Sequence, residues 1–492
     1  MFLTAREMYA AEEAVFSTGV PVEDLMNQAG KKIAREILRR FEKDPVARAI
    51  AVIGKGNNGA DAMVALRHLR EAGWKVAVRS SEDPAGMGGL PAKKWHELGD
   101  VPLLSKLNDF PGKGPLILLD GLLGIGTQGE IREPLAELAG EINDLGERGA
   151  AFVVAVDVPS GLDCDTGSCG RNTVKADLTC TLGSPKTGLV ADQATAHVGG
   201  LTLLELEGLS NWDLTSDHLI TPATLPLESL KRPFGFHKGQ AGRVGIIAGS
   251  RGLAGAAALT SLGALRGGAG LITLFVKEED YPLILPLIPI EVMVKPVSGY
   301  RDLLGENLDA LAIGPGLGSA GMDALTVIRD FKGPTVIDAD ALNLITRRSS
   351  LSTLRPNQLV TPHPGEMSRM LALGKESSTR AEIAREFTKR SQATLLYKGA
   401  RTIVTKRDSP LAYNTTGTPG MATGGQGDLL SGLLAALMAR GLSPIESAKL
   451  GCWLAGRASE LALAVESEES LSATSTGAYL GEAFKNLRSA VV

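Results

Sequence analysis

The sequence predicts an α/β protein of two three-layer domains, and three observations lead to this class. Short runs of Val, Ile and Leu alternate with amphipathic helical patterns along the 492 residues. The apolar runs are continuous, as expected for strands of a parallel sheet that helices cover on both faces. Polar, proline-containing sequence interrupts the pattern near residues 207–231. We therefore expect one domain over residues 1–212 and a second over residues 226–492.

The first half supplies six apolar runs as candidate strands. They are Ala49–Ile53, Val76–Val78, Leu116–Asp120, Phe152–Asp157, Leu178–Leu182 and Leu201–Leu206. The segment between the first two has apolar residues at helical spacing, namely Ala62, Ala65, Leu66 and Leu69. This i, i+3, i+4, i+7 period indicates a helix. A helix between two strands is the kind of crossover that parallel strands require.

The second half follows the same strand and helix alternation. Its candidate strands are Val244–Ala248, Leu271–Val276, Val292–Val297, Leu311–Ile313, Val336–Asp338, Leu359–Thr361, Thr394–Tyr397 and Thr402–Thr405. A helix is expected after Asp428, on the helical spacing of Leu430, Leu433, Leu434 and Leu437. The two halves share no motif, so we interpret the chain as a fusion of two different sites.

Bulk composition limits the classes of function. A formal net charge of −4 argues against a protein that coats nucleic acid or a membrane surface. The apolar stretch Tyr281–Val294 is broken by prolines, and the N-terminus lacks a signal-peptide layout. The four cysteines form no CxxC pair, which argues against a zinc site or a disulfide framework. We therefore expect a cytoplasmic protein without nucleic-acid or membrane partners.

The glycine-rich segment Thr418–Asp428 leads directly into the apolar helix pattern. Small residues at a helix start leave backbone N–H groups open to a phosphate. A carboxylate is a poor phosphate ligand, so Asp428 needs another role. We interpret it as the base that takes a proton from a hydroxyl attacking the phosphate.

Three strand ends in the first half carry polar side chains. Gly54–Asp61 presents Asn57 and Asn58 before a helix, while Asp120 and Asp157 end two further strands. Amide and carboxylate oxygens suit a hard cation or a substrate hydroxyl. The alternative is a set of Asn-Gly turns, Asx turns and helix caps. Three such ends in one sheet favour a shared site.

Strand ends in the second half carry a different set. The small residues of Gly249–Ala257 suit either a flat ligand or close helix packing. His363 stands between two prolines in a stiff turn, which favours a ligand contact over a structural role. Lys398 ends a strand before a glycine and suits a nucleotide phosphate, with a solvated lysine as the alternative. Ile313–Gly318 and Asp338–Asn343 complete the set.

The first-half motifs, with Glu7-Met8 and Leu25–Gly30, together resemble the NAD(P)H-hydrate epimerase domain over residues 1–209. The resemblance implies a Rossmann-like fold that interconverts the R and S epimers of hydrated NADH and NADPH. It implies Asp157 as the acid/base residue at the reacting ring. The implied ligands of a K⁺ ion are Asn58, Asp120 and Ser160. The implied substrate lining is Asn57, Asn58, Gly59, Ala60, Asp61, Gly124, Ile125, Gly126, Thr127, Gln128, Gly129, Glu130 and Asp157.

Two positions depart from the pattern usual in that family. Ala60 lies where Gly-Gly-Asp-Gly is usual, and Ile125 lies where Gly-Thr-Gly is usual. If the backbone at residue 60 requires a positive φ, Ala60 adds strain that a glycine would avoid. The departures bear on the strength of epimerase activity rather than on the fold.

The second-half motifs, closing with Gly-Gly-Gln-Gly-Asp, resemble the ribokinase superfamily and, within it, the NAD(P)H-hydrate dehydratase branch over residues 226–486. That resemblance implies a ribokinase-like fold and removal of water from the S epimer with ADP, accompanied by Mg²⁺. The residues implied to contact the hydrated nucleotide are Ala254, Gly318, His363 and Asp428. Those implied to contact ADP are Lys398, Gly399, Ala400, Arg401, Thr402 and Gly427. Relatives are commonly homo-oligomers.

The main hypothesis is thus a bifunctional repair enzyme that epimerises hydrated NADH and NADPH and dehydrates the S form. One alternative is a ribokinase-like kinase for a small vitamin-type alcohol with an accessory N-terminal domain. Another is an N-terminal domain that only binds, against which the three strand-end carboxylates and the absence of a basic stripe count. The sequence leaves open ADP against ATP and NADH against NADPH hydrate.

Overall fold

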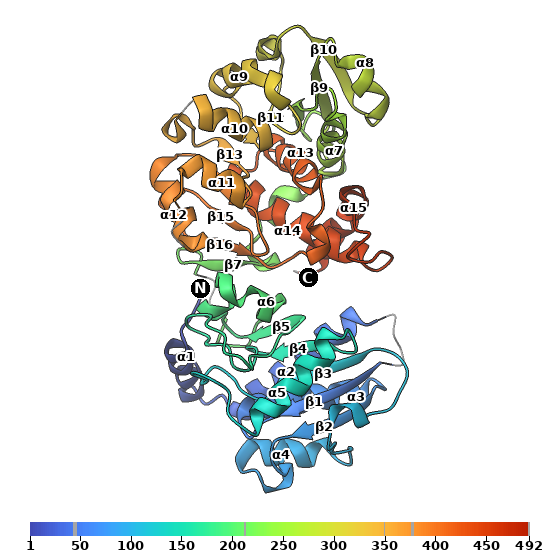
Figure 1. Ribbon diagram of the computed structural model, residues 1–492, viewed down its shortest axis with the longest axis vertical. Coiled ribbons are helices and arrows are strands. Elements are labelled where there is room, and N and C mark those ends of the chain that lie inside the picture. The colour runs from blue at the N-terminus through green and yellow to red at the C-terminus, as the bar shows by residue number, and fades with distance from the viewer. Residues whose placement is uncertain (43–46, 211–212, 349, 375–377, 491–492) are drawn as a thin grey trace. The chain divides into compact units, whose positions relative to one another are not determined.

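The computed structural model describes residues 1–42, 47–210, 213–348, 350–374 and 378–490. They form two compact units, Met1–Asp213 and Leu214–Val492, each built on its own sheet (Figure 1). Residues 211–212, where the first predicted domain ends, lie outside the described residues. The second unit begins before residue 226, because strand β7 (His218–Ile220) pairs with a strand of the second sheet.

The described part of the first unit forms a six-stranded parallel sheet in the order β2-β1-β3-β4-β5-β6. Its strands are β1 (Arg48–Ile53), β2 (Lys75–Ser80), β3 (Leu116–Gly121), β4 (Phe152–Val156), β5 (Leu178–Leu182) and β6 (Gly200–Leu204). Its helices are α1 (Ala5–Ser17), α2 (Val22–Arg40), α3 (Asn57–Glu71), α4 (Gly89–Leu98), α5 (Leu135–Glu147) and α6 (Thr195–Val198). The predicted doubly wound class is confirmed.

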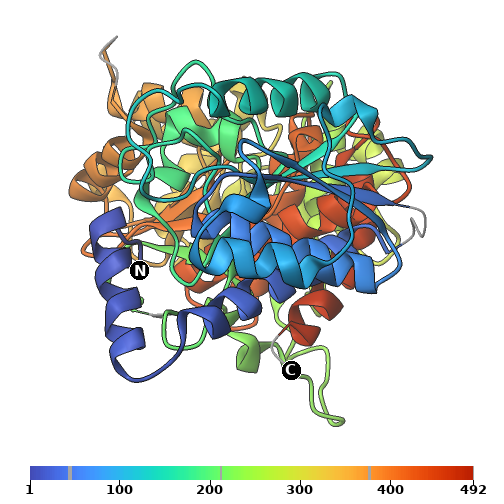
Figure 2. The ribbon, with the colours of Figure 1, turned by 90° about the horizontal axis from the view of Figure 1, so that it is seen from below.

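Alternate side chains of each strand enter separate cores on the two faces of this sheet. Ile53 of β1 packs in the core that contains α2 and α3, whereas Val52 packs in the core that contains α5. Figure 2 shows the layering, with the teal α5 on one side of the strands and blue helices on the other. Burial on both faces explains why these strands are apolar without alternation.

The second unit contains a ten-stranded sheet in the order β10-β9-β8-β11-β12-β13-β14-β15-β16-β7, counted over the described residues. After β7, its strands are β8 (Arg243–Ile247), β9 (Leu271–Lys277), β10 (Met293–Val297), β11 (Ala310–Ile313), β12 (Thr335–Ile337), β13 (Gln358–Val360), β14 (Thr394–Tyr397), β15 (Ile403–Thr405) and β16 (Ala412–Asn414). All eight predicted strands are present.

The sheet departs from the prediction at one edge. β15 runs antiparallel to β14 and to β16, although continuous apolar strands predicted a parallel sheet. β7 and β16 were absent from the prediction, because three-residue strands containing His218 or Asn414 carry little apolar signal. Their pairing joins segments about 195 residues apart, which only the tertiary fold reveals.

Helices cover both faces of the second sheet (Figure 1). They are α7 (Ala254–Arg266), α8 (Tyr281–Ile284), α9 (Ala324–Asp330), α10 (Ala339–Arg348), α11 (Pro364–Leu371), α12 (Arg380–Arg390), α13 (Gln426–Ala439), α14 (Pro444–Ala462) and α15 (Ala473–Ser489). α7 crosses α13 so closely that a Cβ at Gly263 would lie 1.9 Å from the Leu429 carbonyl oxygen. Among the described residues, no helix combines the length and apolar character needed to cross a bilayer.

Candidate active sites

The strand order of the first sheet locates its ligand site. From β1 the chain moves to β2 on one side and later to β3 on the other, which makes β1 and β3 the switch point of a doubly wound sheet. Ligands bind outside the carboxyl ends of the strands at such a point. The chain that leaves these two strands leads directly into Asn57–Asp61, at the start of α3, and Gly124–Glu130, the two predicted substrate-lining segments.

Glycines allow α3 to begin directly on the switch point. A Cβ at Gly59 would lie 2.4 Å from the Gly54 carbonyl oxygen, so no larger residue fits without a backbone shift. Asn57 is exposed at the first position of the helix, and Asn58 is half-buried. Ala60 lies inside α3 and is fully buried, and it is not among the residues with positive φ. The strain that a positive φ at Ala60 would cause is therefore absent.

The loop after β3 lies against α3 and α1. The Cβ position of Gly124 is 3.5 Å from the Asn58 Cβ, and that of Gly126 is 2.9 Å from the Tyr9 hydroxyl oxygen. Thr127 Oγ1 donates a 2.8 Å hydrogen bond to the Gly124 carbonyl oxygen and closes the turn. The half-buried members of this loop are Gly124, Ile125 and Thr127, and the exposed ones are Gly126, Gln128, Gly129 and Glu130.

Hydrogen bonds link the three predicted K⁺ ligands, since Asn58 and Ser160 both bond to the Leu123 backbone and Ser160 also bonds to Asp120. Asn58 Nδ2 donates to the Leu123 carbonyl oxygen at 2.8 Å, and the Leu123 N–H donates to Ser160 Oγ at 2.9 Å. Ser160 donates to the fully buried Asp120 from Oγ at 2.6 Å and from its N–H at 2.8 Å. Burial raises the pKa of Asp120 to about 6, against the opposing effect of these hydrogen bonds.

Asp157 lies at the end of β4 in a left-handed conformation, with φ of 66°. Its Oδ1 accepts hydrogen bonds from the Leu182 N–H at 2.9 Å and from Thr181 Oγ1 at 3.3 Å. The same oxygen forms an ion pair with the ammonium of Lys186, whose side chain is fully buried. A non-glycine residue in this conformation persists where surrounding contacts fix it, often at a functional site.

Three groups near Asp157 escaped the sequence prediction. Lys186 follows β5 at the same sheet edge, and this position was its only sequence signal. Tyr9 and Glu12 come from α1, and no local motif marks them. Burial, and then the neighbouring Asp157 carboxylate, raises the pKa of Glu12. The same two effects, in that order, raise the pKa of Asp61 well above its usual range.

The second sheet has its switch point between β8 and β11. α7 starts there with Ala254, next to the turn that follows β11. The Gly318 N–H donates a 2.8 Å hydrogen bond to Oδ2 of Asp340, and its Cβ position lies 3.4 Å from Ser250 Oγ. The small residues at the start of α7 therefore allow close packing of this helix on α13. The glycines after β11 leave the turn at the switch point open.

Lys398, Asp338 and the start of α13 form the centre of this site. Lys398 Nζ donates to Asp338 Oδ1 at 2.9 Å, and Ser431 Oγ donates to Oδ2 at the same distance. A Cβ at Gly427 would lie 3.2 Å from the Lys398 ammonium. Burial opposes the charge on Lys398, but Asp338 and Glu366 outweigh it and raise its pKa. A persistent cation thus adjoins the N-terminus of α13.

Asp428 lies half-buried in the first turn of α13, which Gly425 starts with φ of +90°. Burial, followed by the repulsion of Asp338, raises the pKa of Asp428 to about 6, against the attraction of Lys398. A carboxylate of this pKa is ionised at neutral pH yet basic enough to accept a proton. The geometry therefore suits the role of base that the sequence suggested.

His363 caps α11 and remains half-exposed. The His363 Nδ1 accepts a 3.1 Å hydrogen bond from the Gly365 N–H, and the backbone N–H of His363 donates to Glu366 Oε2 at 2.8 Å. Its side chain is 50% exposed, with Nε2 3.5 Å from Glu366 Oε1. The capping fixes the ring beside the carboxyl end of β13, and the exposed part of the ring is available to a ligand.

Arg380 stabilises the turn from Lys398 to Thr402. Its guanidinium stacks over the Tyr397 ring and donates to the carbonyl oxygens of Lys398 and Arg401. Gly399 and Ala400 are exposed, whereas the Arg401 side chain is buried and its burial lowers its pKa to about 10. Any contact of Arg401 with ADP would therefore use its backbone rather than its guanidinium.

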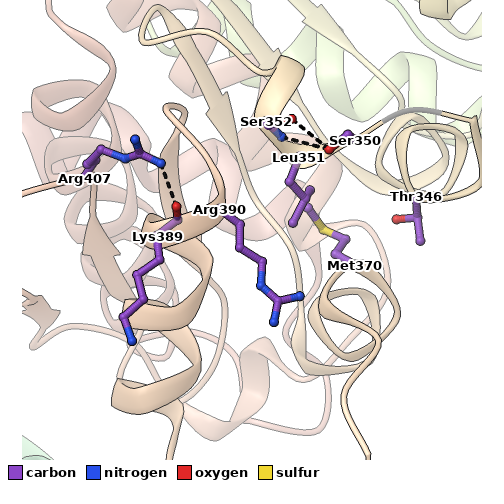
Figure 3. Close-up of a pocket in the computed structure, with 8 residues that line it drawn as sticks. All are labelled: Thr346, Ser350, Leu351, Ser352, Met370, Lys389, Arg390 and Arg407. Carbon is purple, nitrogen blue, oxygen red and sulfur yellow. Dashed lines mark hydrogen bonds between the residues drawn. The ribbon is translucent and has the colours of Figure 1, made fainter.

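A pocket of about 550 Å³ lies elsewhere on the second unit (Figure 3). Its lining is Thr346, Ser350, Leu351, Ser352, Met370, Lys389, Arg390 and Arg407. Arg407 donates to the Lys389 carbonyl oxygen at 2.7 Å, and Arg390 pairs with Glu386. Arg407 and Arg390 thus bind a backbone carbonyl and a surface carboxylate. The pocket includes none of the predicted site residues.

The fold and the two candidate sites indicate an enzyme with two different α/β domains. The first is a doubly wound domain with an acidic, oxygen-rich site. The second combines a glycine-lined helix start with a lysine and a carboxylate, which suits phosphoryl chemistry. Comparison with known families gives the same division. A model described as YjeF-related protein N-terminus matches residues 22–188, and one described as NAD(P)H-hydrate dehydratase matches residues 244–480.

The chain belongs to the family of bifunctional NAD(P)H-hydrate repair enzymes. A protein of that name from Coxiella burnetii is 34% identical over 95% of this chain and 96% of its own length. Those from Moorella thermoacetica and Escherichia coli are also 34% identical, over 99% and 91% of this chain and over 97% and 87% of their own lengths.

Solved structures resemble the second unit. A ribokinase-like superfamily protein from Enterococcus faecalis is 24% identical, with a TM-score of 0.50 over 56% of this chain and 98% of that one. It supports the ribokinase-like fold. A Bacillus subtilis ADP/ATP-dependent NAD(P)H-hydrate dehydratase, crystallised with ATP and Mg²⁺, is 29% identical, with a TM-score of 0.49 over 56% of this chain and 100% of that one.

Proposed function

We propose that this chain repairs hydrated NADH and NADPH: the second unit dehydrates the S epimer with ADP, and the first unit supplies that epimer from the R form. The observation that carries the first part is the position of Asp428 in the opening turn of α13, beside Gly427 and Lys398. A base, backbone N–H groups and a cation are what phosphoryl transfer to a hydroxyl needs.

In the proposed dehydration, Asp428 accepts the proton of the ring hydroxyl while the hydroxyl oxygen attacks the terminal phosphorus of ADP. An O–P bond forms, the bond to the leaving phosphate oxygen breaks, and AMP departs. The N–H groups of Gly425–Gly427 and the Lys398 ammonium stabilise charge on the transferring group. The ring nitrogen then expels phosphate from carbon, and loss of a neighbouring proton restores the dihydronicotinamide.

Ala254, Gly318 and His363 are proposed to contact the hydrated nicotinamide nucleotide. The turn from Lys398 to Thr402 is proposed to contact ADP. The Cβ position of Gly427 lies 3.2 Å from the Lys398 ammonium, which supports a phosphate position near both residues. Mg²⁺ is proposed to accompany ADP, because it keeps several waters and binds largely through phosphate oxygens.

In the proposed epimerisation, the ring hydroxyl receives a proton that Asp157 relays from solvent and departs as water. The electron pair of the ring nitrogen stabilises the planar cation that remains. Water returns to either face and releases a proton. Asp157, as a carboxylate, would stabilise the cation and exchange the proton. Residues 57–61 and 124–130 are proposed to hold the nucleotide, which their position at the switch point supports.

A K⁺ ion is proposed at Asn58, Asp120 and Ser160, because amide, carboxylate and hydroxyl oxygens are a hard donor set and hydrogen bonds link the three residues directly or through Leu123. Bound there, it would supply positive charge near the nucleotide phosphates or hydroxyls. A full-chain epimerase assay with K⁺ replaced by tetramethylammonium at equal ionic strength should lose activity, and Asp120→Asn should lose the response to K⁺. Equal rates in both salts would remove K⁺ from the proposal.

The decisive assay gives the full chain pure S hydrate with ADP or ATP. Repair restores dihydronicotinamide absorbance and releases phosphate, whereas a small-alcohol kinase leaves a stable phosphorylated product. Asp428→Asn is expected to lose turnover while it retains nucleotide binding. Undiminished absorbance recovery by that variant would overturn the assignment. Light scattering of the same sample tests the homo-oligomer expected from relatives. A cytoplasmic location is also proposed, and the four free cysteines support it.

A further inference from the structure

Lys186 carries a buried charge with no role in the epimerisation described above. Its side chain is fully buried, yet its ammonium pairs with Asp157 and donates to the Leu182 carbonyl oxygen at 2.9 Å. Thr181 Oγ1 lies 3.5 Å from the same nitrogen. An unpaired buried ammonium would cost several kcal/mol, so its three acceptors form a position built for the charge.

The N-terminal segment holds Lys186 from its backbone side. Leu3 forms a β-bridge with Lys186: the Leu3 N–H donates to the Pro185 carbonyl oxygen at 2.9 Å, and the Thr187 N–H donates to the Leu3 carbonyl oxygen at 3.3 Å. Two residues further on, α1 begins, and it carries Tyr9 and Glu12 toward the same site. The N-terminal segment thus holds the backbone of Lys186 in place and also brings the Glu12 carboxylate near Asp157, the ion-pair partner of Lys186.

The charges that surround Asp157 make the lysine necessary. Asp61 of α3 and Glu12 of α1 repel its carboxylate, with Tyr9 of α1 and Cys164 also facing the group. Within the described residues, Lys186 is the cation that acts on Asp61, Glu12 and Cys164 together. Without it, the repulsion among these acidic groups would be uncompensated, and the pKa values of Asp61 and Glu12, which are already raised, would rise further.

We propose that Lys186 is a positioning residue for epimerisation: its ammonium holds the Asp157 carboxylate in one orientation and offsets the negative charge of the neighbouring acids. The proposal rests on the proposed epimerase function and on Asp157 as its acid/base residue. Asp157 and Lys186 then act as one unit. Neutralising the lysine would leave the substrate-lining loops in place but return the carboxylate to competition with Asp61 and Glu12.

The experiment follows epimerisation of pure R hydrate by the full chain without ADP, so that the second unit is idle. Lys186→Met is expected to lower kcat about 100-fold, at the lower end of the usual contribution of an acid/base group. The KM for the hydrate should stay within about threefold, because the loops that hold it are unchanged. The pH–rate profile should move to higher pH, because the Lys186 charge lowers the pKa values of Asp61 and Glu12 and its loss would raise both.

Lys94 offers a matched control in the same unit. Its side chain is 2% exposed and its ammonium binds Glu23, Asn27 and Glu97, yet it lies on α4 away from the strand ends. Lys94→Met should lower the melting temperature and leave kcat and the pH profile unchanged. The double variant D157N/K186M should be no slower than D157N, because two residues that act as one unit are not additive.

Three outcomes overturn the proposal, and they differ from one another. K186M with wild-type kcat and pH profile, beside an inactive D157N, removes Lys186 alone. Wild-type epimerisation by D157N removes the acid/base assignment beneath it, and an inactive wild-type protein removes the epimerase function itself. If K186M fails to fold by circular dichroism, Lys186→Gln, which can still donate to Leu182, replaces it with the same expected results.

Discussion

The Lys398 ammonium lies 2.9 Å from Oδ1 of Asp338 and ties the turn after β14 to the end of β12. The Asp338 side chain is 2% exposed, and its other oxygen accepts from Ser431 on α13. One buried carboxylate thus connects three elements of the second site. It also repels the Asp428 carboxylate, so the same group holds the Lys398 ammonium in place and raises the pKa of Asp428.

Lys398→Met should abolish most dehydratase activity and raise the KM for ADP. It also leaves the Asp338 carboxylate buried without its cation, at a cost of about 3–5 kcal/mol in unfolding free energy. The exposed Lys389→Met, in the same unit and paired with Glu386, is the control and should change either quantity little. Denaturant unfolding and initial rates check both. Wild-type ADP affinity in K398M would contradict the assignment.

The dehydratase rate should depend on pH through Asp428. The base must be ionised, so the rate should be half-maximal at about pH 6, the raised pKa of Asp428, and fall about tenfold per unit below it. ADP itself also titrates, and Asp338→Asn separates the two. Removing the Asp338 charge should move the limb to lower pH by lowering the pKa of Asp428. A limb that stays fixed in D338N would assign the titration to ADP.

His363 combines a cap with a proposed substrate contact, and two substitutions separate them. His363→Ala removes the acceptor for the Gly365 N–H and should cost about 1 kcal/mol, whereas His363→Asn supplies another good cap and should not. Both should raise the KM for the hydrate several-fold. Melting temperatures and KM values measured together decide the matter, and a normal KM in H363N would leave His363 with a structural role only.

Gly59 should tolerate no larger residue without a shift of the backbone. Gly59→Ala places a Cβ 2.4 Å from the Gly54 carbonyl oxygen, which should displace α3 from the switch point and lower both stability and epimerase activity. Gly140→Ala on α5 meets nothing within 4 Å and should stabilise the helix by up to about 1 kcal/mol. Thermal melting of both variants is the measurement. Equal behaviour would contradict the close approach seen at Gly59.

The sequence by itself determined the fold class and predicted the location of both candidate sites. Strands buried on two faces are apolar runs, and glycines with polar residues at their carboxyl ends are local signals that need no knowledge of packing. The sequence therefore predicted Asp120, Asp157, Lys398 and Asp428 as candidate site residues. The short strands β7 and β16 were not, because their stability comes from pairing rather than from their own residues.

Only the tertiary structure decided which charges meet. Lys186 lies 29 residues from Asp157, and Lys398 lies 60 residues from Asp338, so no motif contains either pair. Tyr9 and Glu12 reach the first site from a separate helix. Protonation depends on burial and on neighbouring charges, which folding creates. The sequence thus fixes which acids and bases are present, and the packing determines which of them carry a charge.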